Sequence, residues 1–431
     1  MADKKGELRL NVAINIIAIT ALAIFRLTPI INRNIQAVYF MGLYVFWFLS
    51  VAALPKGNRF PYMKKLLVPW MVLLVWQVFL RVVGFSTVSY VGLIMKLTLF
   101  TIPVIIGIVI NVYNKQEIKV LLFSLFSVIF INILSNILIC FQDPDLVVQL
   151  SNLETEFWRF TNLGRTAFVV MCLFFLAYCF VIIRGSQQGS IRVIALVALL
   201  LTAFYMSFQN TRGTDVILGL VMIVSFLFIP QVSTQKRKGR FGYYFLGLVA
   251  LVVAVWQSAN IFDAFEDVFS EDMRMLTRLT DIETLMMSGT DQLDDGSLST
   301  RLLLYGTSIG TFFSSLPNFI FGVGDVLEDA SDITIMLRVG VGGHSEFFDA
   351  MAKFGIIGVV LYYWVISSYY KFFKRLPIEK KGYSMWKITF FIFIFYSFIN
   401  LSFNAEVFFL IFLTVPLAIY YYFSKETIYT R

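Results

Sequence analysis

A single histidine occurs in the chain of 431 residues, and its neighbours could give it a chemical role. His344 follows two glycines and precedes Ser345, at the point where an apolar stretch begins. A neutral imidazole, whose ordinary pKa is about 6.5, is the side chain best suited to accept a proton at pH 7. Ser345 could cap the following helix, whose N-terminus would disfavour the charged imidazole. We therefore predict a general base at His344, with a packed or capping histidine as the alternative.

Two arginines stand at positions where they could bind an anion. Arg212 lies in SFQNTRGTDVIL, in a short turn between two apolar stretches, and Arg301 begins the amphipathic stretch RLLLYGTSIGTFFSSL. The planar guanidinium fork binds phosphate oxygens in pairs, most strongly where water is excluded. The alternatives are an Arg212 that snorkels to the membrane interface and an Arg301 at the surface of an acidic segment.

Four further residues are candidates for substrate contact. Arg274 and Arg278 are four positions apart, so they share one face if this segment is helical. They could contact an anionic substrate, or they could pair with the acidic residues around them in the sequence. Ser345 and Glu346 adjoin the histidine, and the first turn of a helix favours acidic side chains.

The composition indicates an integral membrane protein. Hydrophobic residues make up 58% of the chain and charged residues only 14%, a balance far too apolar for a soluble protein of this length. The apolar stretches match the roughly 17 to 25 residues that a helix needs to cross the hydrocarbon core. We therefore predict an all-α polytopic membrane protein with about twelve transmembrane helices. The predicted spans are 8–25, 35–54, 66–83, 90–112, 118–141, 163–183, 191–209, 214–230, 243–261, 345–366, 386–402 and 405–423.

Basic residues gather in three short connections, at 55–65, 231–241 and 371–387. Because cytoplasmic loops are enriched in Lys and Arg, this pattern predicts that these connections and both termini are cytoplasmic. The net charge of +8 is then a topology signal, with anionic lipid headgroups nearby. A nucleic-acid partner is a poor explanation of this positive charge.

Two outward segments, 142–165 and 262–343, are too long to be simple connections. Residues 262–343 contain fourteen acidic residues against four arginines, a net charge of −10. A structureless loop of that size is uncommon unless it is functional. We predict a folded external cap, with RLLLYGTSIGTFFSSL as a partly embedded helix. The chain would then divide into nine transmembrane helices within 1–261, an external domain at 262–344 and three transmembrane helices within 345–431.

Three sequence patterns together resemble a known family. They are Arg212 in a TRG turn, Arg301 before the P-x4-G-x-G segment at 317–324, and H-S-x9-G-x-x-G at 344–358. This set is similar to the motifs of the O-antigen ligase and Wzy-type O-antigen and capsular polysaccharide polymerase superfamily. The resemblance covers the span layout of most of the chain, and its specific motifs lie within residues 209–358.

The resemblance implies a metal-independent glycosyltransferase at the outer face of the bacterial inner or cytoplasmic membrane, with no cofactor. Its substrate would be an oligosaccharide linked through diphosphate to a polyprenol, which enters from the bilayer. Arg212 and Arg301 would hold the diphosphate and His344 would activate the acceptor hydroxyl. Of the functions that this resemblance implies, we favour a polysaccharide polymerase. A flippase and chain-length regulators would then be its partner proteins.

Two other functions stay open. A ligase would move the finished glycan from the same carrier to a lipid or protein acceptor, and it shares the motifs of the polymerases. A flippase for the lipid-linked unit would perform no bond chemistry. Charged residues inside the spans would be typical of a flippase, and Arg81 and Lys96, near span ends, are nearly all that the sequence offers.

Overall fold

The computed structural model describes residues 10–27, 33–54, 60–84, 102–142, 166–208, 213–229, 298–324 and 339–425. Nearly all of these residues are helical, and they include no strand beyond an isolated bridge between Ile378 and Ser424. In this part of the chain, six helices are long and apolar enough to cross a membrane. The predicted all-α class is therefore confirmed for the described residues.

The helices follow the predicted spans closely. The first eight are α1 (Leu10–Leu27), α2 (Arg33–Ala52), α3 (Phe60–Val82), a helix at Ile102–Val112, α5 (Lys115–Gln142), α7 (Thr166–Gly185), α8 (Gly189–Phe208) and α9 (Gly213–Leu227). They are followed by α12 (Leu298–Phe313), α13 (Leu316–Phe321), α15 (Glu346–Lys374), α16 (Lys380–Ile399), α17 (Ala405–Val407), the π-helical turn η4 (Phe408–Thr414) and α18 (Val415–Phe423). The predicted span 243–261 lies outside the described residues.

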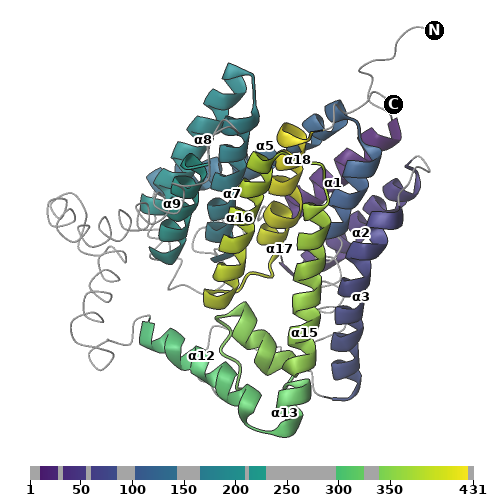
Figure 1. Ribbon diagram of the computed structural model, residues 1–431, viewed down its shortest axis with the longest axis vertical. Coiled ribbons are helices and arrows are strands. Elements are labelled where there is room, and N and C mark those ends of the chain that lie inside the picture. The colour runs from purple at the N-terminus through teal and green to yellow at the C-terminus, as the bar shows by residue number, and fades with distance from the viewer. Residues whose placement is uncertain are drawn as a thin grey trace, which may run out of the picture.

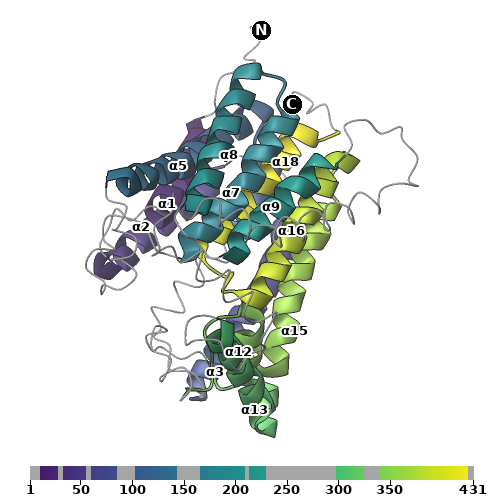
Figure 2. The same ribbon diagram turned by 90° about the vertical axis from the view of Figure 1, so that its left-hand side faces the viewer.

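Helix α7 occupies the centre of the bundle, between α5, α8, α9 and α18 (Figures 1 and 2). Its side chains are buried on every side from Phe168 to Ile182. A helix that is apolar all round has no polar face to turn outward, so its sequence suits a core position. The neighbouring helices cover it and leave their own outer apolar faces exposed, as expected of helices that meet lipid.

Helix α15 departs from the predicted span at 345–366. The sequence predicts a single span at 345–366, but α15 is kinked at Gly355, where φ is 62° and ψ is −169°. This backbone region is essentially restricted to glycine and cannot continue a helix. The segment from Glu346 to Phe354 therefore runs obliquely, and the part after Gly355 turns upward beside α3 (Figure 1).

Helices α12 and α13 lie across one end of the bundle, and we call them the cap (Figures 1 and 2). The expected helix in RLLLYGTSIGTFFSSL is present as α12. Its Tyr305 hydroxyl donates to the Ile399 carbonyl at the end of α16, at 2.7 Å. On its outer face, Leu302 and Leu303 are 49% and 53% exposed. An amphipathic helix with outward leucines suits the predicted partial embedding in the membrane interface.

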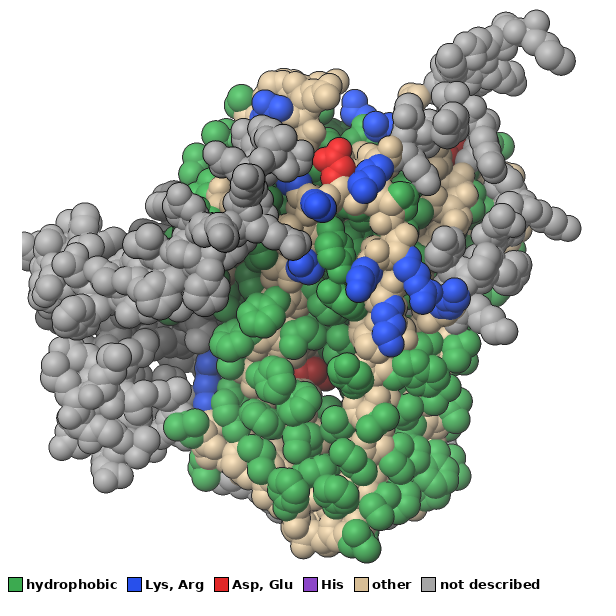
Figure 3. Space-filling model, in the orientation of Figure 1, with side chains coloured by type: hydrophobic (Ala, Val, Ile, Leu, Met, Phe, Trp, Pro, Cys, Tyr) green, Lys and Arg blue, Asp and Glu red, His purple; other side chains and the backbone are tan. Residues whose placement is uncertain are grey.

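The other end of the bundle, which we call the basic end, carries lysines and arginines. The Lys381 ammonium, at the start of α16, donates to the Arg184 carbonyl at 3.4 Å. Arg184, at the end of α7, donates to the carbonyl of Leu227 at the end of α9, at 3.1 Å. In the view of Figure 3, Lys and Arg side chains gather over the upper part of the molecule, and hydrophobic side chains cover the lower part. Helix α16 starts at the basic end and finishes at the cap. Helix α9 ends at the basic end, beside Arg184, and therefore runs in the opposite direction.

Candidate functional site

Two glycine-containing motifs that are distant in sequence meet between α13 and α15. Pro317 lies in the first turn of α13, whose N-cap Ser315 accepts from the Asn318 amide at 3.2 Å. After α13, the Val323 amide donates to the Ala352 carbonyl at 2.8 Å. The Gly324 amide donates to the next carbonyl along α15, also at 2.8 Å. The P-x4-G-x-G segment is thus joined backbone to backbone with the stretch that precedes Gly355.

The glycines at this junction are required by both conformation and space. Gly322 has φ of 75° and ψ of −176°, the same glycine-only region as Gly355. A Cβ atom on Gly322 would lie 2.4 Å from the Lys353 carbonyl, and one on Gly355 would lie 2.3 Å from the Ile320 carbonyl. Because each glycine has no side chain, the backbone of the other motif can approach it closely. This contact with the cap fixes the kink in α15.

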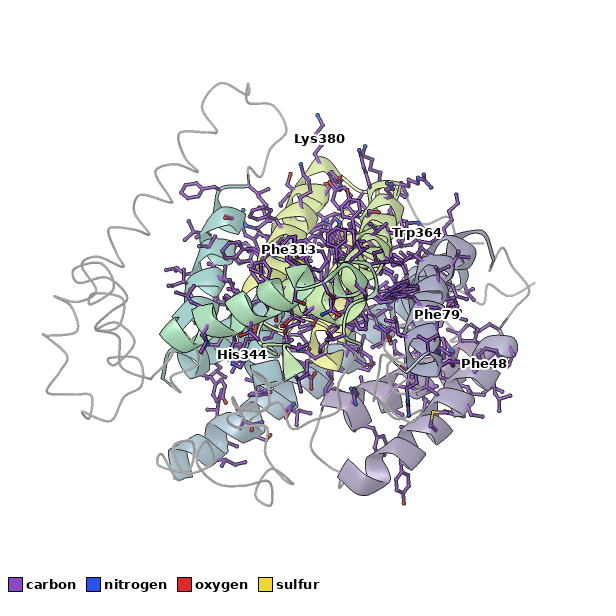
Figure 4. The ribbon with its side chains drawn as sticks, turned by 90° about the horizontal axis from the view of Figure 1, so that it is seen from below. Phe48, Phe79, Phe313, His344, Trp364 and Lys380 are labelled. Carbon is purple, nitrogen blue, oxygen red and sulfur yellow. The ribbon has the colours of Figure 1, made fainter. Side chains whose placement is uncertain are left out.

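His344 lies in the loop between the cap and α15, beside α12 (Figure 4). The imidazole is half-buried, and its Nδ1 lies 3.0 Å from the Gly342 carbonyl oxygen. A carbonyl can only accept, so Nδ1 carries the proton in this hydrogen bond. In a neutral imidazole with this hydrogen bond, the lone pair is on Nε2.

Ser345 has the capping role that the sequence predicts. Its backbone is extended, with φ of −135° and ψ of 119°, and its hydroxyl accepts from the Phe348 amide at 3.2 Å. Such a cap stabilises a helix by about 1 kcal/mol. The side chain is fully buried and also donates to the Ser397 carbonyl at 3.4 Å. This burial leaves Ser345 with a structural role and does not support contact with substrate.

Glu346 holds a second loop against the site. Its Oε2 accepts from the amides of Ser402 at 3.3 Å and Phe403 at 3.1 Å. Its own amide donates to the Asn400 carbonyl at 3.2 Å. The connection between α16 and α17 is thereby tied to the first turn of α15. Glu346 orders this connection through these bonds, and substrate contact by its carboxylate stays a prediction.

Arg301 occupies the first turn of α12 and is half-buried. The face of α12 that includes Leu304, Tyr305 and Ser308 packs on the His344 loop and on α15, since a Cβ on Gly342 would meet the Leu304 carbonyl. Positions three, four and seven residues apart share one side of a helix. Arg301 therefore belongs to the face of α12 that covers the His344 loop, one turn before Leu304.

The remaining predicted arginines, Arg212, Arg274 and Arg278, lie outside the described residues. The direction of α9 still bears on Arg212, because this helix begins at Gly213 and ends at the basic end. The start of α9 therefore points toward the end of the bundle where the cap and His344 lie.

Sequence reasoning missed two residues that join the cap to the histidine loop. Asp349 is 2% exposed and accepts from the Ser308 hydroxyl at 2.7 Å. In the sequence, Asp349 is one acidic residue in a first helical turn, and Ser308 is one of several hydroxyl residues in α12. Only the seven-residue spacing that places Arg301 and Ser308 on one helix face could have signalled the second of them.

A metal site is not built by the described part of the chain, in which no three His, Cys, Asp or Glu side chains gather. Most of the acidic residues of 262–343 lie outside that part. Metal independence therefore stays a prediction.

No protein-family model matches this chain, and no curated protein matches it either. The resemblance of its motifs to the ligase and polymerase superfamily thus stays a prediction from the sequence.

Proposed function

We propose that this protein is a polysaccharide polymerase, a membrane glycosyltransferase that joins oligosaccharide repeat units carried on polyprenyl diphosphate. The observation that carries the proposal is the packing at the cap. The His344 loop, helix α12 with Arg301 in its first turn, and the two glycine motifs form one hydrogen-bonded unit although they are spread over residues 298–358. Such convergence is expected of a site and not of separate loops that only connect spans.

The proposed orientation places this unit at the outer face of the cytoplasmic membrane. Support comes from the basic end, where Lys371, Lys374, Arg375, Lys380 and Lys381 lie around the connection between α15 and α16. By the enrichment of Lys and Arg in cytoplasmic loops, the basic end is cytoplasmic. The cap and His344 then face outward, in a chain of about twelve spans with both termini inside.

The proposed reaction is transfer of a growing glycan to a hydroxyl group at the non-reducing end of a new lipid-linked unit. The hydroxyl oxygen attacks the anomeric carbon of the donor and forms the new glycosidic bond. The bond from that carbon to the diphosphate oxygen breaks, and the diphosphate leaves with the electron pair. The proton of the hydroxyl passes to Nε2 of His344, since Nδ1 is bonded to the Gly342 carbonyl.

Arginine charge would accelerate this step by stabilising the leaving group. Negative charge grows on the diphosphate as the glycosidic bond breaks, so a guanidinium beside it binds the transition state more tightly than the ground state. Arg301 has a suitable position on the face of α12 toward the His344 loop. We propose Arg212 as its companion, with Arg274 and Arg278 as further contacts to the substrate.

The first experiment is a gel of lipid-linked glycans from a strain that lacks this gene, beside the same strain with the gene restored. A polymerase predicts that a single repeat unit accumulates on the carrier when the gene is absent. A full ladder still attached to the carrier, with nothing delivered to an acceptor, would instead identify a ligase. Normal glycan in both strains would contradict both enzymes.

Chelation tests the proposed metal independence. Membranes that contain the protein should extend glycan chains at an unchanged rate after treatment with EDTA. Loss of chain growth in EDTA, followed by recovery with magnesium or manganese, would show that acidic residues of 262–343 bind a metal ion needed for the reaction.

A further inference from the structure

Three basic side chains from different helices converge on the C-terminal turn of α7, at the basic end. Arg184 belongs to that turn, and its guanidinium donates to the Leu227 carbonyl at 3.1 Å, where α9 ends. The Lys381 ammonium of α16 donates to the Arg184 carbonyl at 3.4 Å. From the first turn of α8, Nε of Arg192 donates to the Ser186 carbonyl at 2.5 Å. The three charges therefore meet where α7, α8, α9 and α16 lie side by side (Figure 2).

Two of these cations are partly withdrawn from water. Arg184 and Lys381 are half-buried, and the Lys381 ammonium lies 5.3 Å from the ring centre of Phe423 on α18. Lysine and arginine side chains that leave water are normally paired with an opposite charge. Within the part of the chain that the structure describes, no carboxylate forms an ion pair with Arg184, Arg192 or Lys381. Each of the three donates to a backbone carbonyl instead.

These carbonyls do not balance the charge of the group. The C-terminus of a helix carries roughly half a negative charge, so the ends of α7 and α9 together supply about −1. Glu379, the N-cap residue of α16, attracts the Lys381 ammonium, while Arg184 and Arg192 repel it. Two helix ends and one carboxylate thus leave about one positive charge of the three unbalanced. The junction therefore favours an anion that carries a single negative charge.

A phosphodiester carries that charge, and its oxygens suit these donors. Guanidinium groups bind phosphate oxygens through paired N–H donors, and a lysine adds a compact charge. Arg192 uses Nε for the Ser186 carbonyl, and its two Nη groups have no acceptor among the described residues. Next to it, α8 turns Val193, Ile194 and Val197 outward as exposed apolar side chains. Acyl chains can lie along this surface while a headgroup phosphate meets the cations.

We propose that Arg184, Arg192 and Lys381 bind the phosphodiester headgroup of an anionic phospholipid, in the leaflet at the basic end. Basic sites between helices at the cytoplasmic face are typical binding sites for anionic headgroups. The bound headgroup ties α7, the central helix, to α8 and α16, so it stabilises the folded bundle. The inference goes beyond glycan transfer and does not depend on it, because these residues lie at the end opposite the cap.

Thermal unfolding of the full-length protein in dodecyl maltoside micelles measures this binding. Phosphatidylglycerol is titrated into the micelles, since a ligand that binds only the folded state raises the melting temperature. We expect a saturable rise with phosphatidylglycerol and a much smaller one with phosphatidylcholine, whose choline cation is repelled by the positive charge of the site. An equal rise with the two lipids, or no rise with either, would overturn the inference.

A pair of substitutions and a matched control locate the site. In Arg192→Gln/Lys381→Gln, half-maximal stabilisation should need about tenfold or more phosphatidylglycerol, because charged hydrogen bonds to the phosphate are lost. The control is Lys374→Gln/Lys380→Gln, which removes the same charge from the same end at two exposed positions. Its titration should match that of the wild type. Equal shifts in the two double variants would show a diffuse surface attraction and overturn a defined site.

A single substitution keeps the test decisive if the double variant does not fold. Arg192 is exposed and lies at the start of α8, so Arg192→Gln should fold like the wild type. It should still weaken the effect of phosphatidylglycerol severalfold, since one guanidinium contact to the phosphate is lost. A wild-type titration in this variant would overturn the inference.

Inorganic phosphate separates a lipid headgroup from a soluble anion of the same chemistry. Sodium phosphate is added without lipid and compared with sodium chloride at equal ionic strength, so that screening is the same. We expect no difference in melting temperature, because the soluble ion has no acyl chains to place along α8. A rise as large as that from phosphatidylglycerol, absent in Arg192→Gln/Lys381→Gln, would overturn the lipid and assign the site to soluble phosphate.

Discussion

The two ends of this helical bundle carry charge in opposite ways. At the basic end, lysines and arginines lie at the surface and donate to carbonyls where helices finish, as Arg184 does to Leu227. At the cap end, the charged side chains of the α15 N-terminus turn inward. Asp349 is buried, and Glu346 accepts from two backbone amides. The basic end carries its charged groups at the surface, whereas the charged groups of the cap end order a loop.

The difference has a physical cause. A surface lysine keeps most of its hydration, so its replacement costs little stability. The sign of its charge therefore matters more than its exact position. A buried carboxylate has given up its hydration and must keep each hydrogen bond, so its donors fix its position. The basic end is therefore suited to set orientation in a membrane, and the cap end is suited to hold a reactive group.

The largest effect is expected from His344→Ala. Removal of a general base typically lowers a rate by about 10²- to 10⁴-fold, so chain growth should stop on the time scale of the wild-type reaction. Protein level and membrane insertion should not change, because His344 lies in the loop before α15 and outside the helices of the bundle. Chain growth is measured on glycan gels, and normal growth in this variant would remove His344 from the mechanism.

The next effect concerns the junction between the cap and α15. Gly355→Ala should destabilise the protein on the order of 3 kcal/mol, since alanine is strained at φ of 62° and its Cβ would meet the Ile320 carbonyl. Chain growth should fall with it, because the His344 loop loses its support. Thermal unfolding in detergent measures the change.

The matched control for that substitution is Gly306→Ala in α12. A Cβ at Gly306 meets nothing within 4 Å, and alanine is the better helix former by about 1 kcal/mol. This variant should be as stable as the wild type or more so. Equal changes in melting temperature for the two variants would show that the kink at Gly355 does not stabilise the cap.

A smaller loss is expected from Arg301→Lys. Lysine keeps the charge but not the planar pair of donors, and a hydrogen bond to a charged group is worth about 1.5 to 3 kcal/mol. We expect kcat/KM for lipid-linked donor to fall about tenfold or more, with the melting temperature unchanged. A wild-type rate for this variant would exclude a two-point contact with the diphosphate.

The smallest effect is expected at the basic end, from Lys381→Ala. Its ammonium donates to one carbonyl and lies 5.3 Å from the ring centre of Phe423, contacts worth about 1 kcal/mol in total at a partly exposed site. The melting temperature should fall by a few degrees at most, and chain growth should stay within twofold of the wild type. A loss as large as that of His344→Ala would break the contrast between the two ends.

Much of the fold could be predicted from the sequence because lipid imposes a simple rule. A helix satisfies every backbone hydrogen bond internally, so about 20 apolar residues in succession specify a spanning element without reference to the rest of the chain. The helices α1, α5, α7 and α16 each lie within a few residues of a predicted span. The helix in RLLLYGTSIGTFFSSL followed from its amphipathic pattern for the same local reason.

The kink in α15 could not be predicted in this way. The G-x-x-G spacing permits close packing between helices, but it does not say that Gly355 adopts a glycine-only conformation. That conformation exists because the backbone of α13 approaches it, 35 residues earlier in the chain at Ile320. Nothing local to either segment specifies such a contact.

By itself, the sequence determined that the chain is helical and apolar, where most of its helices lie, and which histidine could act as a base. These properties depend on residues close together along the chain, through helix periodicity, hydropathy and the chemistry of the imidazole. Only the tertiary structure decided that Asp349 and Ser308 bind the backbone of the loop that carries His344, and that the Gly342 carbonyl meets Nδ1 of the imidazole. Those features depend on α12 and α15 meeting in space, and hydrogen bonds between distant segments leave no periodic signal in a sequence.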